Sequence, residues 1–204
     1  MIEAKISGIF PDPIYLAKLD RKFTKQELEV VEEMRTDELQ NIGNTFSVNH
    51  DVLNHPSFTT LKKEVDLFIG DYFSKILLPP KTVVPYITQS WLNYTKPNEF
   101  HHTHNHVNTY LSGVLYINAD KAHDKITFEN IRYDQIQLPI TAWNLFNSYD
   151  MSFAVESGDI IIFPSRLPHL VPPKEGKNTR VSISFNVFVK GILGQPGSLS
   201  ELTL

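Results

Sequence analysis

Apolar residues recur at helical spacing in the N-terminal part of the chain. Thr24 and Glu27 form a capping box, in which each side chain satisfies the other's free backbone N–H, and we expect a helix over 25–38. Ser57 is expected to cap a longer helix that ends before Pro79-Pro80. Its apolar stripe is made of Phe58, Leu61, Val65, Phe68, Tyr72 and Ile76. A helix with one apolar face needs a sheet to cover.

After Pro85 the pattern changes to short runs that are typical of strands. The expected strands are 86–94, 109–118, 125–129, 152–156, 159–163 and 179–189. The last run alternates cleanly and predicts an apolar face made of Val181, Ile183 and Phe185, opposite a polar face made of Ser182, Ser184 and Asn186. Short strands separated by turn residues indicate a sandwich, a barrel or a jelly roll.

The remaining segments are less regular. Residues 4–19 are expected to form a strand, a turn at 11–13 and a second extended piece, and 44–48 a possible short strand within an irregular stretch. Residues 130–151 are expected to form a loop or lid, and the glycine-rich tail 190–204 to be loosely ordered. The aromatic residues of that lid are Tyr133, Trp143, Phe146 and Tyr149.

Composition narrows the class of protein. The 204 residues suit one domain, with support elements in 1–85, a core in 86–190 and a tail in 191–204. The net charge of −4, without a basic run, does not suggest a nucleic-acid partner. The absence of cysteine excludes disulfides and Cys-ligated zinc. We find no apolar run long enough for a membrane span and no signal-peptide pattern, so a cytoplasmic location is expected.

Four histidines lie close together in the stretch EFHHTHNHVN: His101, His102, His104 and His106. Imidazole is a common ligand of iron, zinc, copper and nickel. In an extended segment, residues two apart project to the same face. Either His104 with His106, or His102 with His104, can therefore share one ion. The alternative is a polar surface loop without a metal.

A third ligand must come from elsewhere, and His169 is the obvious candidate. It follows the strand that begins at Gly158-Asp159 and is broken at Pro164-Ser165, which places it at the mouth of the sheet. The prolines around it favour extended backbone. A structural histidine without a metal is the alternative.

Arg180 and Ser182 point the same way from one strand. An arginine that faces the interior needs an anion, and its planar guanidinium fits a carboxylate. An exposed surface ion pair is the alternative for this residue. The order of features favours a site: paired histidines, a strand, a long insertion, a Gly-Asp strand, a histidine and then Arg-x-Ser.

In that order of motifs the chain resembles the 2-oxoglutarate and Fe(II)-dependent oxygenases, in particular a branch common in bacteria and in phages of marine cyanobacteria. The matching stretches are FPDPI at 10–14, SWLNYTKP at 90–97, HTHNHVNTYLSGVLYI at 102–117, SGDIIIFPSRLPHLVPP at 157–173 and TRVSISFN at 179–186. The resemblance implies a mainly β fold with flanking α-helices: a double-stranded β-helix, or cupin-like jelly roll, with the N-terminal helices packed on its sheet.

The resemblance also implies roles for individual residues. Its metal ligands fall on His104, His106 and His169, and they would hold Fe(II). Arg180 would bind the distal carboxylate of the co-substrate 2-oxoglutarate, with Ser182 beside it. The other expected pocket residues are Asn93, Tyr116 and Asn186. The implied reaction couples decarboxylation of 2-oxoglutarate to oxidation, for example hydroxylation, of a substrate.

One position departs from the pattern of the superfamily. Most members carry His-x-Asp or His-x-Glu with a distal histidine, whereas the second position here is His106. Three neutral ligands leave the site one negative charge short. His102 is the reserve ligand, and the nearest acidic residues, Asp120 and Glu129, have no spacing argument in their favour.

Two rival functions remain open at this stage. A cupin-like metal enzyme that does not use 2-oxoglutarate would make Arg180 dispensable, and a non-enzymatic or virion-associated β-sandwich would bind no metal. The substrate, whether a small molecule or a peptide, is not readable from the sequence, and neither is the oligomeric state, although a homodimer through a strand edge is possible. A phage-encoded protein would act in the host cytoplasm.

Overall fold

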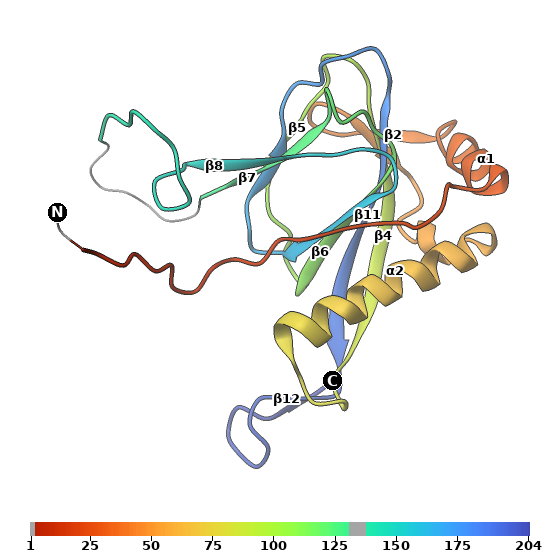
Figure 1. Cartoon of the computed structure of the whole chain (residues 1–204). Helices are drawn as coiled ribbons and strands as arrows, with labels where there is room; N and C mark the ends of the chain where they lie inside the picture. Colours follow the sequence, from red (N-terminus) through yellow and green to blue (C-terminus); the bar gives the residue numbers. More distant parts are fainter. Residues whose placement is uncertain (1–2, 131–137) are drawn as a thin grey trace.

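The computed structural model describes residues 3–130 and 138–204. Two antiparallel sheets face each other, and the two α-helices cover the outer face of the larger one (Figure 1). The larger sheet has the order β1-β9-β6-β11-β4-β3-β2, and the smaller has the order β5-β10-β7-β8. Among the described residues, no helix combines the length and the apolar character that a bilayer span requires.

The strand bounds follow the chain. The larger sheet contains β1 (Tyr15–Lys18), β2 (Glu38–Gln40), β3 (Thr45–Ser47), β4 (Val84–Thr95), β6 (Leu111–Asn118), β9 (Asp159–Pro164) and β11 (Arg180–Lys190). The smaller sheet contains β5 (His101–His104), β7 (Lys125–Glu129), β8 (Asp150–Ala154) and β10 (His169–Val171). A separate hairpin near the C-terminus contains β12 (Ile192–Leu193) and β13 (Leu202–Thr203). The expected strands over 86–129 and 152–189 are confirmed with shifted ends.

The short strands differ most from expectation. β5 and β10 were not predicted, because each is too brief for an alternating pattern to emerge. The first strand expected within 4–19 is absent, and only the second extended piece forms, as β1. The tail is more regular than expected, because Gly191 and Leu204 exchange two backbone hydrogen bonds at the end of the β12–β13 hairpin.

The first helix, α1 (Lys25–Met34), has the expected capping box between Thr24 and Glu27. It ends earlier than expected, and the next residues turn into β2. Val30 and Val31 of this helix are buried, whereas Leu28 is 43% exposed.

The second helix, α2 (Thr59–Tyr72), starts differently from the prediction. Ser57 does not cap it but lies in a short 3-10 helix, η2 (Pro56–Phe58), where the His55 ring accepts a hydrogen bond from the Ser57 backbone N–H. Another 3-10 turn, η1 (Val52–Asn54), comes before it. A π-helical turn, η3 (Phe73–Leu77), follows α2 and ends at Leu78, whose φ of 49° is left-handed.

Two apolar clusters hold the layers together. The larger lies between the helices and the large sheet, where Leu61, Val65 and Ile69 of α2 pack with Ile183 and Phe185 of β11. The smaller lies between the two sheets and is formed by Tyr116, Ile126, Phe128, Val155, Ile161, Phe163 and Leu167. The alternation predicted for β11 is therefore confirmed: its apolar residues face the helices and its polar residues face the space between the sheets.

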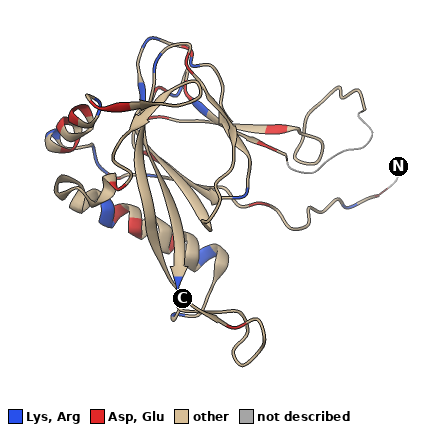
Figure 2. Cartoon of the chain, turned by 180° about the vertical axis from the view of Figure 1, so that it is seen from behind, with Lys and Arg blue, Asp and Glu red and all other residues tan. Residues whose placement is uncertain are grey.

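Charged residues are unevenly distributed between these layers. Figure 2 shows Lys, Arg, Asp and Glu mainly on the helices and loops, with most of each strand free of them. Arg180 is an exception, since it begins β11 and is only 3% exposed. A buried charge requires a partner, so this residue points to a binding role.

Gly113 of β6 offers a test of the larger core. It lies opposite Phe185, and a Cβ added at Gly113 would come within 2.1 Å of the Phe185 ring. We expect Gly113→Ala to lower the free energy of unfolding by about 1–3 kcal/mol, because the ring has to move out of a packed core. Chemical denaturation measures the change.

The matched control is Gly70→Ala in α2, where an added Cβ meets nothing within 4 Å. This variant should be stabilised by up to about 1 kcal/mol, because alanine favours a helix interior more than glycine does. Equal effects of the two substitutions would contradict the packing described for Phe185.

Candidate active site

Three histidines converge between the sheets. One ring nitrogen of each of His104, His106 and His169 lies within 4.8 Å of the others, and no other group of this kind was found among the described residues. His104 of β5 and His169 of β10 are register partners on adjacent strands. His106 follows β5, and its backbone N–H donates to the Ser165 carbonyl at 3.0 Å. The ladder and this loop contact together bring the rings to one point.

The hydrogen bonds of the three rings leave the same nitrogen of each free. Nδ1 lies 2.8 Å from the His102 carbonyl in His104, 3.0 Å from the Leu167 carbonyl in His169 and 2.7 Å from the Asn186 side-chain oxygen in His106. A carbonyl oxygen only accepts, so Nδ1 carries the proton in each ring. Each Nε2 therefore presents a lone pair, as a metal ligand requires.

Burial keeps these imidazoles neutral. It lowers the pKa of His104 to about 4 and that of His169 to about 3, and it also lowers the pKa of His106. At neutral pH none of the rings needs to lose a proton before it binds a metal. A set of three imidazoles suits iron, nickel, copper or zinc.

Arg180 lies in the same cavity as the three histidines. Its guanidinium donates to the Thr95 hydroxyl at 3.2 Å and to the Lys125 carbonyl at 3.4 Å. Its Nε is buried and has no hydrogen-bond partner among the described residues. Burial lowers the pKa of this guanidinium, with Tyr116 and Asp124 acting in the opposite direction. An anion in the cavity would supply the missing partner.

The other predicted pocket residues take different places. Asn93, Tyr116 and Ser182 line the cavity. The Asn93 amide donates to the Ser184 hydroxyl at 2.9 Å, and its side-chain oxygen is buried without a partner. Asn186 does not line the cavity but lies behind His106, where it accepts from Nδ1 and donates to the Gln89 side chain at 3.2 Å.

Several cavity residues were not predicted from the sequence. His101 lies with its ring centroid 4.3 Å from that of His104, in a stacked arrangement. Trp91 approaches His106 at 5.7 Å between ring centroids, and Ser184 lies on the polar face of β11. Ser184 could have been predicted, because the alternating pattern of β11 places it on the same face as Ser182. Nothing in the local pattern separated His101 from His102.

The reserve ligands lie outside the three-histidine group. His102 does not line the cavity, and its Nδ1 is buried without a partner among the described residues. Asp120 pairs with His123 at 2.8 Å, and Glu129 accepts from the Thr103 hydroxyl at 3.3 Å. The site as arranged therefore has no carboxylate ligand among the described residues.

The described part of the predicted lid beyond residue 137 lies away from the cavity. It leads into β8 and projects beyond the sheets (Figure 1). Trp143 and Tyr149 contact each other edge to face, with ring centroids 5.5 Å apart, and Phe146 is 61% exposed. None of these residues lines the histidine cavity. Tyr133 lies outside the described residues.

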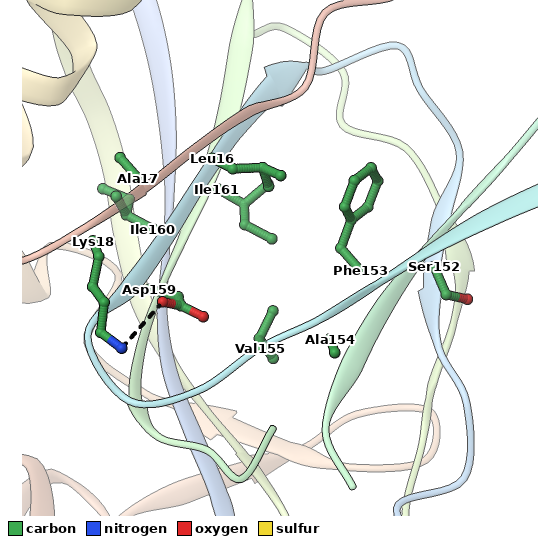
Figure 3. A pocket seen from close by; sticks show the side chains of 10 residues that line it. All are labelled: Leu16, Ala17, Lys18, Ser152, Phe153, Ala154, Val155, Asp159, Ile160 and Ile161. Atoms are coloured by element: carbon green, nitrogen blue, oxygen red, sulfur yellow. Dashed lines mark ion pairs between the residues drawn. The ribbon is translucent and has the colours of Figure 1, made fainter. Parts of the chain in front are cut away.

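A wider groove lies elsewhere, between β1 and β9 on one side and β8 on the other (Figure 3). It has a volume of about 460 Å³, and its lining includes apolar side chains such as Ile161 and Phe153. Its charged groups are Lys18 and Asp159, which lie 3.8 Å apart. It contains no histidine. The histidine cavity has more converging polar groups and is the better candidate for catalysis.

Residues 89–186 match a family model described as "Putative 2OG-Fe(II) oxygenase". This segment belongs to the 2OG-Fe(II) oxygenases. It contains the three converging histidines, Arg180 and the cavity between the sheets. The resemblance described from the sequence motifs is therefore confirmed. No curated protein matches the chain.

Solved structures show the same fold as this oxygenase domain and its N-terminal support. HygX from Streptomyces hygroscopicus, with nickel and 2-oxoglutarate bound, is 11% identical, with coverage of 86% of this chain and 82% of that chain and a TM-score of 0.58. The epimerase SnoN from nogalamycin biosynthesis, in complex with Fe3+, alpha ketoglutarate and nogalamycin RO, is 12% identical, with coverage of 95% and 91% and a TM-score of 0.59.

A prolyl hydroxylase from Trichoplax adhaerens, in complex with a peptide fragment of the hypoxia inducible factor, is also similar. It is 11% identical, with coverage of 86% of this chain and 83% of that chain and a TM-score of 0.57. At such identities the likeness establishes the fold alone. The double-stranded β-helix expected for this oxygenase domain is confirmed.

Asn186 provides a test of the metal site. We expect Asn186→Leu to weaken binding of Ni(II) or Fe(II) about tenfold, because the His106 ring loses one of the two groups that hold its Nδ1, the other being the Ser112 hydroxyl at 2.8 Å. Competition with a chelating dye measures the affinity. The control is Asn118→Leu, which changes an exposed residue of β6 that does not line the cavity. Unchanged affinity in Asn186→Leu would show that His106 does not depend on this contact.

Proposed function

We propose that the chain is an Fe(II)- and 2-oxoglutarate-dependent oxygenase. The observation that carries the proposal is the arrangement of one cavity, in which three neutral imidazoles face a buried Arg180 whose Nε lacks a partner among the described residues. The family match over residues 89–186 supports the same activity. His104, His106 and His169 are assigned to the iron.

The polar atoms of the cavity fit the co-substrate. A planar guanidinium matches a carboxylate, and Nε of Arg180 is free to donate to it. Tyr116 and Ser182 are register partners on adjacent strands and line the same cavity as Arg180. We therefore assign the distal carboxylate of 2-oxoglutarate to Arg180. The free side-chain oxygen of Asn93 suits a donor such as a bound water.

When bound, iron and 2-oxoglutarate supply oxidative decarboxylation coupled to oxidation of a substrate. The role of the protein's own residues is to orient the reacting groups. The acceptors of Nδ1 orient the three imidazoles, and Arg180 orients the co-substrate from the large sheet. Val114 and Ile126 add apolar surface to the cavity wall, which limits the access of water.

The proposed reaction is hydroxylation of a C–H bond in a small molecule or a peptide. The solved relatives include a hydroxylase with a peptide fragment bound and an epimerase, so the fold accommodates substrates of both sizes. The described part of the β7–β8 insertion presents Trp143 and Phe146 to solvent. We assign to this insertion contact with the part of a substrate that extends beyond the cavity, because these two aromatic side chains offer exposed apolar area.

An anaerobic titration tests the proposal. Wild-type protein loaded with Fe(II) should develop the weak visible charge-transfer band of the iron–keto acid complex as 2-oxoglutarate is added. His169→Ala should lose iron and the band. Arg180→Ala should keep iron but require at least about tenfold more 2-oxoglutarate, because a charged hydrogen-bonding partner is lost. Arg180→Lys should be intermediate, since it keeps the charge and loses the planar fork.

His123→Ala is the matched control, because His123 lies outside the histidine cavity. It should bind iron and 2-oxoglutarate as the wild type does. Iron binding without a band in the wild type would favour a cupin-like enzyme that does not use a keto acid. A wild-type protein that binds no iron would favour a non-enzymatic binding module.

A further inference from the structure

His101 and Asn41 form a contact that the proposed function does not use. Asn41 precedes the turn between β2 and β3, and its side-chain nitrogen lies 3.2 Å from Nε2 of His101. The same nitrogen donates to the side-chain oxygen of Asn44 at 3.1 Å. The side-chain nitrogen of Asn44 donates to the Thr45 carbonyl at 3.4 Å, so its oxygen faces Asn41 and the Asn41 nitrogen is the donor. Nε2 of His101 must then accept.

The turn is fitted closely to the histidine strand. Gly43 has a φ of 91°, and its carbonyl accepts from the backbone N–H of Phe100, the residue before His101, at 2.9 Å. A Cβ at Gly43 would lie 2.7 Å from the Phe100 carbonyl oxygen. Only glycine fits this approach. The N-terminal part of the chain is thereby attached beside the cavity, with Asn41 directed at His101.

This contact determines the tautomer of His101. A histidine ring that accepts a hydrogen bond at Nε2 has no proton on that nitrogen and is neutral. A neutral ring that accepts at Nε2 carries its proton on Nδ1. His101 lines the cavity that contains the three histidines and Arg180, and its Nδ1 has no hydrogen-bond partner among the described residues. A donor is therefore left available to a ligand.

We propose that His101, oriented by Asn41, donates a hydrogen bond from Nδ1 to an oxygen of the bound 2-oxoglutarate. This inference rests on the proposed function, because it requires the keto acid to occupy the histidine cavity. His101 stacks on the ligand His104 without joining the three-histidine group, so its role is to bind the co-substrate and not the metal. In this role His101 is a neutral hydrogen-bond donor to 2-oxoglutarate, in addition to the cationic donor Arg180.

The test separates binding of the co-substrate from binding of the metal. Iron affinity is measured by competition with a chelating dye, and 2-oxoglutarate affinity by the charge-transfer band of the anaerobic iron-loaded protein. His101→Phe keeps an aromatic ring and removes the donor. It should weaken 2-oxoglutarate binding roughly tenfold or more and leave iron affinity unchanged, because hydrogen bonds to charged groups are strong.

Two further variants locate the donor on the ring. The side-chain nitrogen of asparagine can take the place of Nδ1, so His101→Asn should bind 2-oxoglutarate more tightly than His101→Phe does. Asn41→Leu should also weaken 2-oxoglutarate binding, because the tautomer of His101 is no longer selected. His123→Phe, the same replacement at an exposed histidine outside the cavity, is the control and should behave as the wild type.

Wild-type affinity for 2-oxoglutarate in His101→Phe would overturn the inference while leaving the proposed function intact. Equal losses of iron and 2-oxoglutarate affinity in that variant would also overturn it, because they would indicate a structural role. A wild-type protein that binds iron but gives no band with 2-oxoglutarate would overturn the proposed function and this inference together.

Discussion

The alternation of residues along β11 is the constraint on which the rest of the structure depends. Because successive side chains of a strand point to opposite faces, one strand can serve two environments. Val181, Ile183 and Phe185 pack toward the helices. Arg180 and its neighbours two residues apart face the space between the sheets. A shift of one residue in register would exchange the two sets, placing the guanidinium in the apolar core and Phe185 in the cavity.

The site combines contributions from both sheets. The smaller sheet and the loop after β5 carry the histidines, and the larger sheet carries Arg180. The apolar cluster between the sheets sets their separation, and Phe163 contacts His169 with ring centroids 4.8 Å apart. Carbonyl oxygens accept hydrogen bonds from Nδ1 of the three rings and so leave Nε2 of each ring free. Packing brings the rings together, and hydrogen bonding makes them able to bind a metal.

Much of this arrangement could be predicted because it depends on local periodicity. The capping box at Thr24, the faces of β11 and the grouping of His104, His106 and His169 follow from spacing along the chain or from recognisable motifs. The contact between Asn41 and His101 could not be predicted, since it joins residues far apart in sequence through a turn without periodic pattern. Asn186 was expected to line the pocket. Its side chain instead accepts a hydrogen bond from His106, and it is the His106 ring that lines the cavity.

The register partnership of His104 and His169 has a consequence for how such a protein can diversify. The two residues are adjacent across β5 and β10, although a long stretch of chain separates them. The spacing of these two proposed metal ligands is set by backbone hydrogen bonds between strands and not by the length of the intervening segment. Insertions between β7 and β8 can therefore lengthen, shorten or change composition while the ligand geometry is retained. Under the proposed roles, selection for new substrates and selection for metal binding would act on separable parts of the chain.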